Sequence, residues 1–129
     1  MLDRFPVYAV LPTSDLDRSR TWWKERMGMT PAMEDPGGLW YGCGQGTWLL
    51  VTPSQFAGTA QNTAASFKVS DIAAVMTDLR SRGVVFEEYD LPMFKTVDGL
   101  FEYGGYRAAW FKDSEGNIVE IGQVPESIS

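Results

Sequence analysis

Trp110-Phe111-Lys112-Asp113-Ser114-Glu115-Gly116-Asn117-Ile118-Val119-Glu120-Ile121 decides the fold, because the same arrangement occurs earlier in the chain. The earlier copy is Trp40-Tyr41-Gly42-Cys43-Gly44-Gln45-Gly46-Thr47-Trp48-Leu49-Leu50-Val51, which aligns without a gap at an offset of 70 residues. Further upstream, Ser14-Asp15-Leu16 matches Ser70-Asp71-Ile72 at an offset of 56. The chain therefore contains one half twice, and each position can be compared with its counterpart in the other half.

The composition is that of one folded domain. The 129 residues are 44% hydrophobic and 13% aromatic, which is enough to build a packed core. The formal charge of −6 argues against a nucleic-acid partner, because phosphate binding needs clustered Lys and Arg. No apolar run is long enough to span a bilayer, and the N-terminus lacks a signal-peptide pattern. With a single cysteine as well, the sequence predicts a cytoplasmic protein without a membrane partner.

The absence of histidine restricts the chemistry further. Histidine is the residue that titrates near neutral pH and the commonest metal ligand, so catalytic triads and zinc sites that use it are excluded. Any proton transfer has to use a carboxylate, tyrosine, lysine, cysteine or water.

The first half is expected to contain a strand, a helix and three further strands. Leu16 to Met27 shows helical spacing of apolar residues, after a capping-box-like start at Ser14 and before a stop at Gly28. The strands are expected at residues 5–11, 30–34, 39–41 and 47–52.

The second half repeats this order. Its helix is expected to begin at Ser70 or Asp71 and to end at Gly83. Strands are expected at residues 63–69, 84–89, 106–111 and 117–123, and residues 91–105 are expected to form a long loop. Alternation along the first of these strands predicts Ala65, Phe67 and Val69 on the helix side and Ala64, Ser66 and Lys68 on the opposite face. Glu120 should lie on that opposite face too.

At this point the chain resembles the vicinal oxygen chelate superfamily, which includes glyoxalases, extradiol dioxygenases, fosfomycin-resistance enzymes and bleomycin-resistance proteins. The resemblance covers nearly the whole length and rests on two motifs, residues 10–19 leading into the helix with Trp22-Trp23, and residues 109–121. It implies an α+β fold of two tandem βαβββ modules, each a curved half-barrel sheet with a helix outside and a concave ligand cavity. It also implies a homodimer. We assign residues 1–53 to module 1, 54–62 to a linker, 63–124 to module 2 and 125–129 to a tail.

Enzymes of this superfamily hold a divalent metal at four pocket-facing strand positions. The resemblance places these positions at Tyr8, Leu50, Ala64 and Glu120, and the two repeat offsets relate them in pairs. Only Glu120 is a strong ligand, because tyrosine is normally protonated near neutral pH and the other two side chains are apolar. We therefore expect no metal and no other cofactor.

A ligand cavity is predicted from the aromatic residues that alternation and the repeat place on the concave side. The predicted ligand-binding residues are Tyr8, Trp40, Trp48, Leu50, Ala64, Ser66, Lys68, Phe94, Phe101, Tyr106, Trp110 and Glu120. The loop that carries Phe94, Phe101 and Tyr103 is open to two interpretations, a mobile lid or a surface loop anchored by its aromatic rings.

Three functions remain open from the sequence. The first is metal-free binding of a small aromatic molecule that can carry a positive charge, as in the bleomycin-resistance branch, with antibiotic resistance as one use. The second is a metal-independent lyase or isomerase, with Glu120 as the general base and Tyr8 or Lys68 as the acid. The third is a metal enzyme in which Glu120 is joined by loop carboxylates such as Glu102 or Asp98. We rank binding first, so that a role other than catalysis is preferred.

Overall fold

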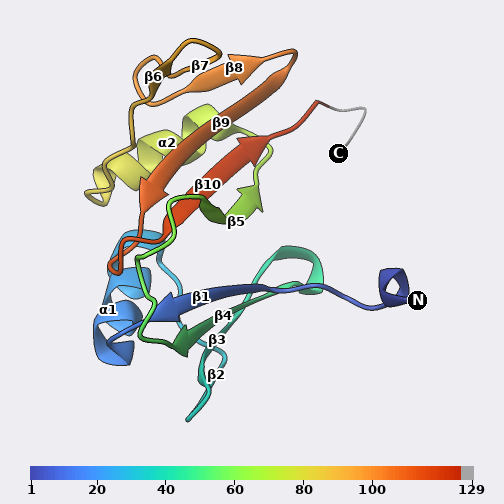
Figure 1. The fold of residues 1–129 in the computed structure, drawn as a ribbon, viewed down its shortest axis with the longest axis vertical. Helices are drawn as coiled ribbons and strands as arrows, with labels where there is room; N and C mark the ends of the chain where they lie inside the picture. The colour runs from blue at the N-terminus through green and yellow to red at the C-terminus, as the bar shows by residue number, and fades with distance from the viewer. Residues whose placement is uncertain (126–129) are drawn as a thin grey trace.

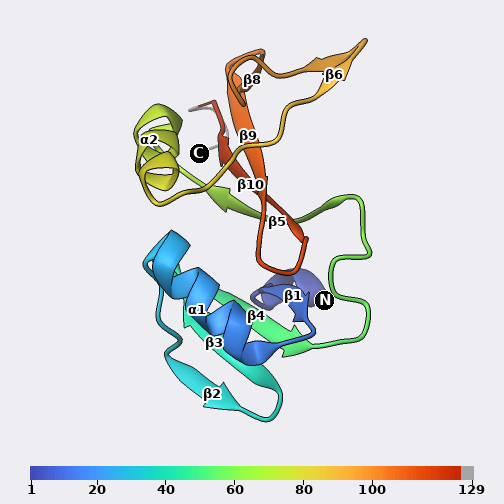
Figure 2. The same cartoon turned by 90° about the vertical axis from the view of Figure 1, so that its left-hand side faces the viewer.

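In the part of the chain that the structure describes, two four-stranded sheets are each associated with one helix, and residues 90–95 form a further two-stranded sheet (Figures 1 and 2). The computed structural model describes residues 1–125. In module 1 the elements are a 3-10 turn (Leu2–Arg4), β1 (Ala9–Thr13), α1 (Leu16–Met27), β2 (Met33–Asp35), β3 (Gly38–Gly42), a second 3-10 turn (Gly44–Gly46) and β4 (Trp48–Pro53). In module 2 they are β5 (Thr63–Lys68), α2 (Ile72–Ser81), β6 (Asp90–Leu91), β7 (Phe94–Lys95), β8 (Phe101–Tyr103), β9 (Tyr106–Lys112) and β10 (Ile118–Gln123). Neither helix is long and apolar enough to cross a membrane.

The two sheets have the same topology, and the same register around Leu50 and Glu120, which confirms the duplicated α+β fold. Sheet 1 runs β1-β4-β3-β2 and sheet 2 runs β5-β10-β9-β8, and in each the first pair is parallel. Leu50 pairs with Val10 and Trp40, and its counterpart Glu120 pairs with Ser66 and Trp110. The offsets of 56 and 70 therefore hold in space as well as in sequence.

The residue that caps α1 is one position later than the sequence predicted. Asp15, not Ser14, caps α1, because its carboxylate accepts from the Arg18 amide at 3.0 Å. Ser14 is instead bonded to Glu115 of module 2. Asp71 caps α2 in the equivalent way, which settles the choice between it and Ser70.

Four predicted stretches of structure differ from what is observed. β1 begins only at Ala9, because residues 5–8 have no strand partner along sheet 1. Residues 84–89 are not a strand: Val84 and Phe86 are buried in the core, and Glu87 makes one backbone hydrogen bond to Trp110 instead of a ladder. Residues 91–105 are not a structureless loop, since β6, β7 and β8 lie there. The strand expected at 30–34 lies instead at Met33–Asp35.

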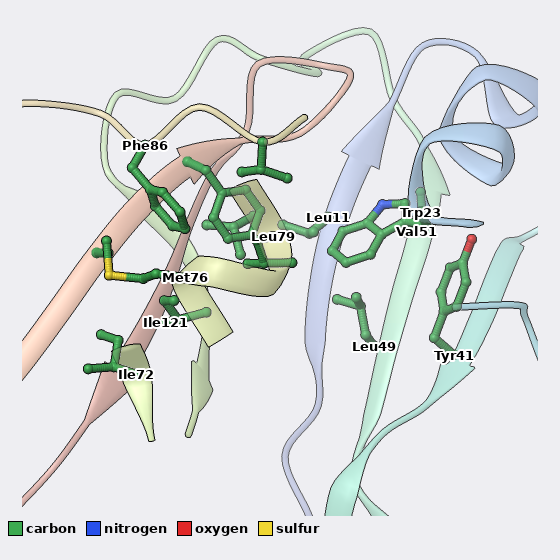
Figure 3. Packing of buried hydrophobic residues seen from close by; sticks show 14 of the residues in the cluster. Leu11, Trp23, Tyr41, Leu49, Val51, Ile72, Met76, Leu79, Phe86 and Ile121 are labelled. Carbon is green, nitrogen blue, oxygen red and sulfur yellow. The ribbon is translucent and has the colours of Figure 1, made fainter. Parts of the chain in front are cut away.

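One continuous apolar core lies between the helices and both sheets (Figure 3). Alternate strand residues supply it, including Leu49 and Val51 from β4 and Val119 and Ile121 from β10. Trp23 of α1 is fully buried and lies 5.8 Å from the Tyr41 ring in its own module and 6.3 Å from the Phe67 ring of module 2. The helix of module 1 thus packs against both modules. The predicted helix-facing set Ala65, Phe67 and Val69 packs against this core, which confirms the assignment of faces.

The turn between β9 and β10 joins module 2 to module 1. Glu115 accepts hydrogen bonds from the Arg18 guanidinium at 2.7 and 2.8 Å and from the Ser14 amide at 2.9 Å. Asn117 donates to the Pro12 carbonyl at 2.8 Å and accepts from the Gly58 amide. Gly58 has a φ of +72°, and a Cβ there would lie 2.0 Å from the Glu115 carbonyl oxygen. These contacts hold the two sheets side by side and so fix the relative position of their concave faces.

Candidate functional site

The face of sheet 1 that points away from the helices carries aromatic and apolar side chains; we call it the sheet 1 face. It comprises Tyr8, Val10, Trp40, Trp48 and Leu50. Alternation puts them here because Leu11, Leu39, Tyr41, Leu49 and Val51 point into the core. The Tyr8 and Trp40 rings lie 5.1 Å apart, and Trp40 and Trp48 meet edge to face at 6.3 Å. Tyr8 and Val10 are each 48% exposed and Trp48 is 41% exposed, so this face presents aromatic surface for stacking.

The equivalent face of sheet 2 carries a hydrogen-bonded carboxylate; we call it the sheet 2 face. It comprises Ser66, Phe101, Tyr106, Trp110 and Glu120. The Ser66 hydroxyl donates to Glu120 Oε1 at 2.6 Å, and the Tyr106 hydroxyl donates to Glu120 Oε2 at 2.9 Å. Burial of the phenol raises the pKa of Tyr106 to about 12, and the hydrogen bond to Glu120 and the negative charge of Glu120 act in the same direction. Tyr106 is therefore protonated at neutral pH and acts as the donor.

Gly122 makes room for this arrangement. It follows Glu120 on the same face of β10, and a Cβ at Gly122 would lie 3.2 Å from the Tyr106 hydroxyl oxygen and 3.6 Å from Glu120 Oε1. Any larger side chain would push the phenol away from the carboxylate. Gly122 was not among the predicted site residues, although the alternation of Ile118, Glu120 and Gly122 gives a signal for it.

A short hairpin, β6–β7 (residues 90–95), covers part of the sheet 2 face; we call it the arm. Figure 2 shows α2 on one side of sheet 2 and β6 on the other. Phe94 of the arm stacks on Phe101 at 4.7 Å and lies 5.0 Å from the Trp110 ring. Tyr89, at the base of the arm, lies 5.7 Å from the Trp110 ring and was not predicted as a site residue. The arm is anchored by its aromatic rings, in agreement with one of the two interpretations of this loop.

A cleft of about 420 Å³ lies between the two modules. Its walls are the start of β1, the β3–β4 turn and strand β5, and it is lined by Val7, Tyr8, Ala9, Cys43, Gly44, Gln45, Thr47, Trp48, Leu49, Ala65, Ser66, Phe67 and Lys68. Burial raises the pKa of the Cys43 thiol, so this cysteine is a neutral wall residue and not a thiolate nucleophile.

The predicted site residues fall into three groups. The structure brings together Tyr8, Trp40 and Trp48 on sheet 1, Ser66, Tyr106 and Glu120 on sheet 2, and Phe94, Phe101 and Trp110 under the arm. Lys68 is exposed and lines the cleft, and Leu50 lies in the middle of the sheet 1 face. Ala64 is exposed and has no register partner, because sheet 2 has an irregularity between the pairs Ile118–Thr63 and Val119–Ala65.

The four positions that correspond to metal ligands in superfamily enzymes, Tyr8, Leu50, Ala64 and Glu120, do not carry a set of side chains that suits a metal. Leu50 and Ala64 have no donor atom, and both oxygens of Glu120 accept hydrogen bonds from hydroxyl groups. Within residues 1–125 no three Cys, Asp or Glu side chains are grouped closely enough to hold a metal ion. The alternative ligands Glu102 and Asp98 do not join Glu120 in such a group; the Glu102 carboxylate lies 3.4 Å from Arg107 Nε.

Two βαβββ modules whose sheets remain open define the fold class, and comparison with known proteins assigns the chain to a family within it. The sequence profile of the Glyoxalase/Bleomycin resistance protein/Dioxygenase superfamily matches residues 6–121, so the chain belongs to this superfamily. Among curated proteins, none matches the chain.

Three solved structures illustrate the shared fold. A bleomycin-binding protein complexed with bleomycin has 17% identity and a TM-score of 0.71, over 94% of this chain and 99% of that one. A glyoxalase/bleomycin resistance protein from Catenulispora acidiphila has 21% identity and a TM-score of 0.69, with the same coverage. TnmS3, an antibiotic-binding protein from a Streptomyces species, has 20% identity and a TM-score of 0.61, over 94% of this chain and 96% of that one.

Proposed function

We propose that this protein binds and sequesters a small aromatic molecule without a metal, using the sheet 1 face and the sheet 2 face as the walls of the site. The observation that carries the proposal is the character of these faces. They offer aromatic rings and one hydrogen-bonded carboxylate, Glu120, which is the only strong metal ligand among the four positions that the resemblance assigns to a metal site. Ligand sites are typically apolar with a few placed polar groups, which is the composition found here.

Two of the similar structures support a binding role. One is a bleomycin-binding protein and another an antibiotic-binding protein. Because their identity to this chain is low, they support the class of function and not a particular ligand. Protection of a cell against an aromatic antibiotic, in the cytoplasm, is the use we propose.

We propose further that the protein works as a homodimer. The sheet 1 face leaves Tyr8, Val10 and Trp48 about half exposed, and apolar surface of this kind is usually covered by a ligand or a partner. A second copy would enclose the site without any additional component. Sedimentation equilibrium tests this: a monomer at micromolar concentration would contradict it.

Titration of tryptophan fluorescence with a panel of planar aromatic compounds, including antibiotics, tests the binding function. We expect saturable quenching by at least one class, because Trp40 and Trp48 lie on the exposed sheet 1 face. Trp48→Ala should weaken binding, whereas Met93→Ala, at an exposed site on the arm, should leave it unchanged. The absence of any saturable signal across the panel would count against the proposal. Native mass spectrometry of the purified protein would identify a ligand that co-purifies.

Glu120 also supports a second candidate function, that of a metal-independent lyase or isomerase. The Tyr106 hydroxyl donates to its carboxylate at 2.9 Å, which makes this phenol a candidate acid in addition to Tyr8 and Lys68. Glu120→Gln separates the two functions. It should abolish turnover of a substrate if Glu120 is the base, but only weaken binding if the protein sequesters its ligand.

A further inference from the structure

The Glu120 carboxylate has hydrogen-bond partners but no charged partner within residues 1–125. Its two hydrogen bonds come from the neutral hydroxyls of Ser66 and Tyr106. The two cations on β9 lie beside other carboxylates, with Arg107 Nε 3.4 Å from Glu102 and Lys112 Nζ 3.4 Å from Glu87. Two hydroxyl donors direct the carboxylate without neutralising it, so its negative charge remains available to a ligand.

This carboxylate is held in a fixed position. Ser66 lies opposite Glu120 on β5 and Tyr106 reaches it across Gly122, so each oxygen is restrained from a different strand. A carboxylate has about four acceptor positions on its two oxygens, and the protein uses two of them. The remaining acceptor positions can take further donors. A group restrained in this way loses little conformational freedom when a ligand binds.

Aromatic rings lie next to the charge. The phenol of Tyr106 contacts the carboxylate directly, and its ring is only half-buried. Trp110, the register partner of Glu120 on β9, is buried beneath the arm, so Tyr106 is the ring beside the carboxylate that a ligand can reach. Rings of this kind attract a cation through the negative charge of their faces, and they also stack on planar molecules. A positively charged nitrogen close to an aromatic ring therefore satisfies both features of the sheet 2 face.

We propose that Glu120 is the counter-ion for a protonated amine or quaternary ammonium group on the aromatic ligand, with Ser66, Tyr106 and Gly122 as the residues that position it. This inference rests on the proposed binding function and specifies the class of ligand. A metal ion is a poor alternative occupant, because within residues 1–125 Glu120 is not part of a group of three Cys, Asp or Glu side chains that could hold one. The overall charge of −6 also favours the approach of a cation over that of an anion.

Lys68 is the residue that most directly competes with this inference. It lies two residues from Ser66 on β5 and pairs in register with Gly122, so it is close to the carboxylate in the sheet. The Lys68 ammonium forms no ion pair with Glu120 in the described part of the chain, and the side chain is exposed at the cleft. If Lys68 neutralised Glu120 in solution, its removal would strengthen the binding of a cation.

Three probes of nearly equal shape test the inference: 1-naphthylmethylammonium, the neutral 1-naphthylmethanol and the anion 1-naphthylacetate. We expect isothermal titration calorimetry to give about tenfold tighter binding for the ammonium than for the alcohol, the size of one charge-assisted hydrogen bond. Glu120→Gln should reduce this ratio to about one, by weakening the binding of the ammonium far more than that of the alcohol. Tyr106→Phe should reduce the ratio by a smaller factor, and added salt should reduce it in the unsubstituted protein. Lys68→Ala should leave the ratio unchanged or raise it.

The outcomes distinguish this inference from the proposed function. Binding of the alcohol without a preference for the ammonium, or a preference that Glu120→Gln retains, would overturn the charge inference and leave the binding function standing. A Lys68→Ala variant that loses the preference would also overturn it. If none of the three probes binds, both proposals fail. The ratio in the unsubstituted protein and its salt dependence give a result even if a variant does not fold.

Discussion

The two β-hairpin turns of the repeat occupy equivalent positions but have different roles. In module 2, Glu115 has a side chain that is 1% exposed and holds Arg18 and Ser14 of module 1. Its counterpart in module 1 is Gln45, which lies in an exposed turn and lines the cleft. After duplication, one copy of the turn connects the modules and the other is free to form a wall of the site.

The concave faces differ in the same manner. Leu50 and Glu120 are equivalent in register, yet Leu50 lies among Trp40, Trp48 and Val10 on an open face, while Glu120 is hydrogen-bonded. The arm covers part of sheet 2, and no such hairpin is present in module 1. One face offers stacking and the other offers charge and directed hydrogen bonds, so a ligand that uses both must have an apolar and a polar end.

Substitutions in the two helices should give the largest difference in stability between the modules. Trp23 and Leu79 are equivalent at the offset of 56, and the Trp23 ring lies 6.3 Å from the Phe67 ring of the other module. We expect Trp23→Ala to cost about 3–5 kcal/mol of unfolding free energy and Leu79→Ala about 2–3 kcal/mol, because the larger side chain leaves the larger cavity. Urea unfolding followed by circular dichroism measures both. A larger cost for Leu79→Ala would show that α1 does not have the special role in joining the modules.

The turns can be compared directly through Asn117 and its counterpart Thr47. Asn117 is buried, and its amide bridges the Pro12 carbonyl and the Asp113 carboxylate. We expect Asn117→Ala to cost about 2–3 kcal/mol, because these buried groups lose a hydrogen-bond donor. Thr47 is exposed and bonds only to Gly44 of its own turn through its hydroxyl, so Thr47→Ala should cost about 0.5 kcal/mol or less. Equal losses in thermal melting experiments would contradict the idea that one turn connects the modules and the other does not.

The same turn predicts a pH dependence. The Arg18 guanidinium, through its hydrogen bond, lowers the pKa of Glu115 from 4.5 to about 2. Because the folded chain holds this proton less tightly than the unfolded chain, the contribution to stability is complete above about pH 4.5. It is lost as the pH falls towards about 2.

Glu115→Gln is the variant that measures this contribution. We expect it to lower the unfolding free energy by about 1–2 kcal/mol at pH 7, a value that allows for the half-exposed Arg18. The difference between the two proteins should shrink below pH 4.5. Gln45→Asn, which suits the positive φ of that position, is the control and should give no pH-dependent difference. A Glu115→Gln difference that stays constant down to pH 2.5 would contradict the assignment.

The sequence predicts the repeat, the faces of the strands and the aromatic character of the site, because these depend on local alternation and on offsets within the chain. It does not predict which partner a polar side chain meets. Ser14 is a good local helix cap, but Glu115 of the other module bonds to it, and Asp15 caps the helix instead. Residues 84–89 have the alternation of a strand, but no neighbouring strand accepts them. The role of Gly122 depends on the length of the Tyr106 side chain across two strands, which is a tertiary contact. The module boundaries and the individual roles of the site residues stay predictions.

The arm, which is present only in module 2, should give the smallest effect among these tests. Phe94 contacts Phe101 and Trp110, whereas its neighbour Met93 is 91% exposed. We expect Phe94→Ala to cost about 1 kcal/mol and to make Trp110 more accessible to acrylamide, since ring contacts of this kind contribute about that much. The emission of Trp110 is isolated by subtracting the same protein carrying Trp110→Phe. Met93→Ala should change neither quantity. If Trp110 is quenched equally with and without the Phe94 ring, the arm does not cover the sheet 2 face, and the two concave faces are more alike than their sequences indicate.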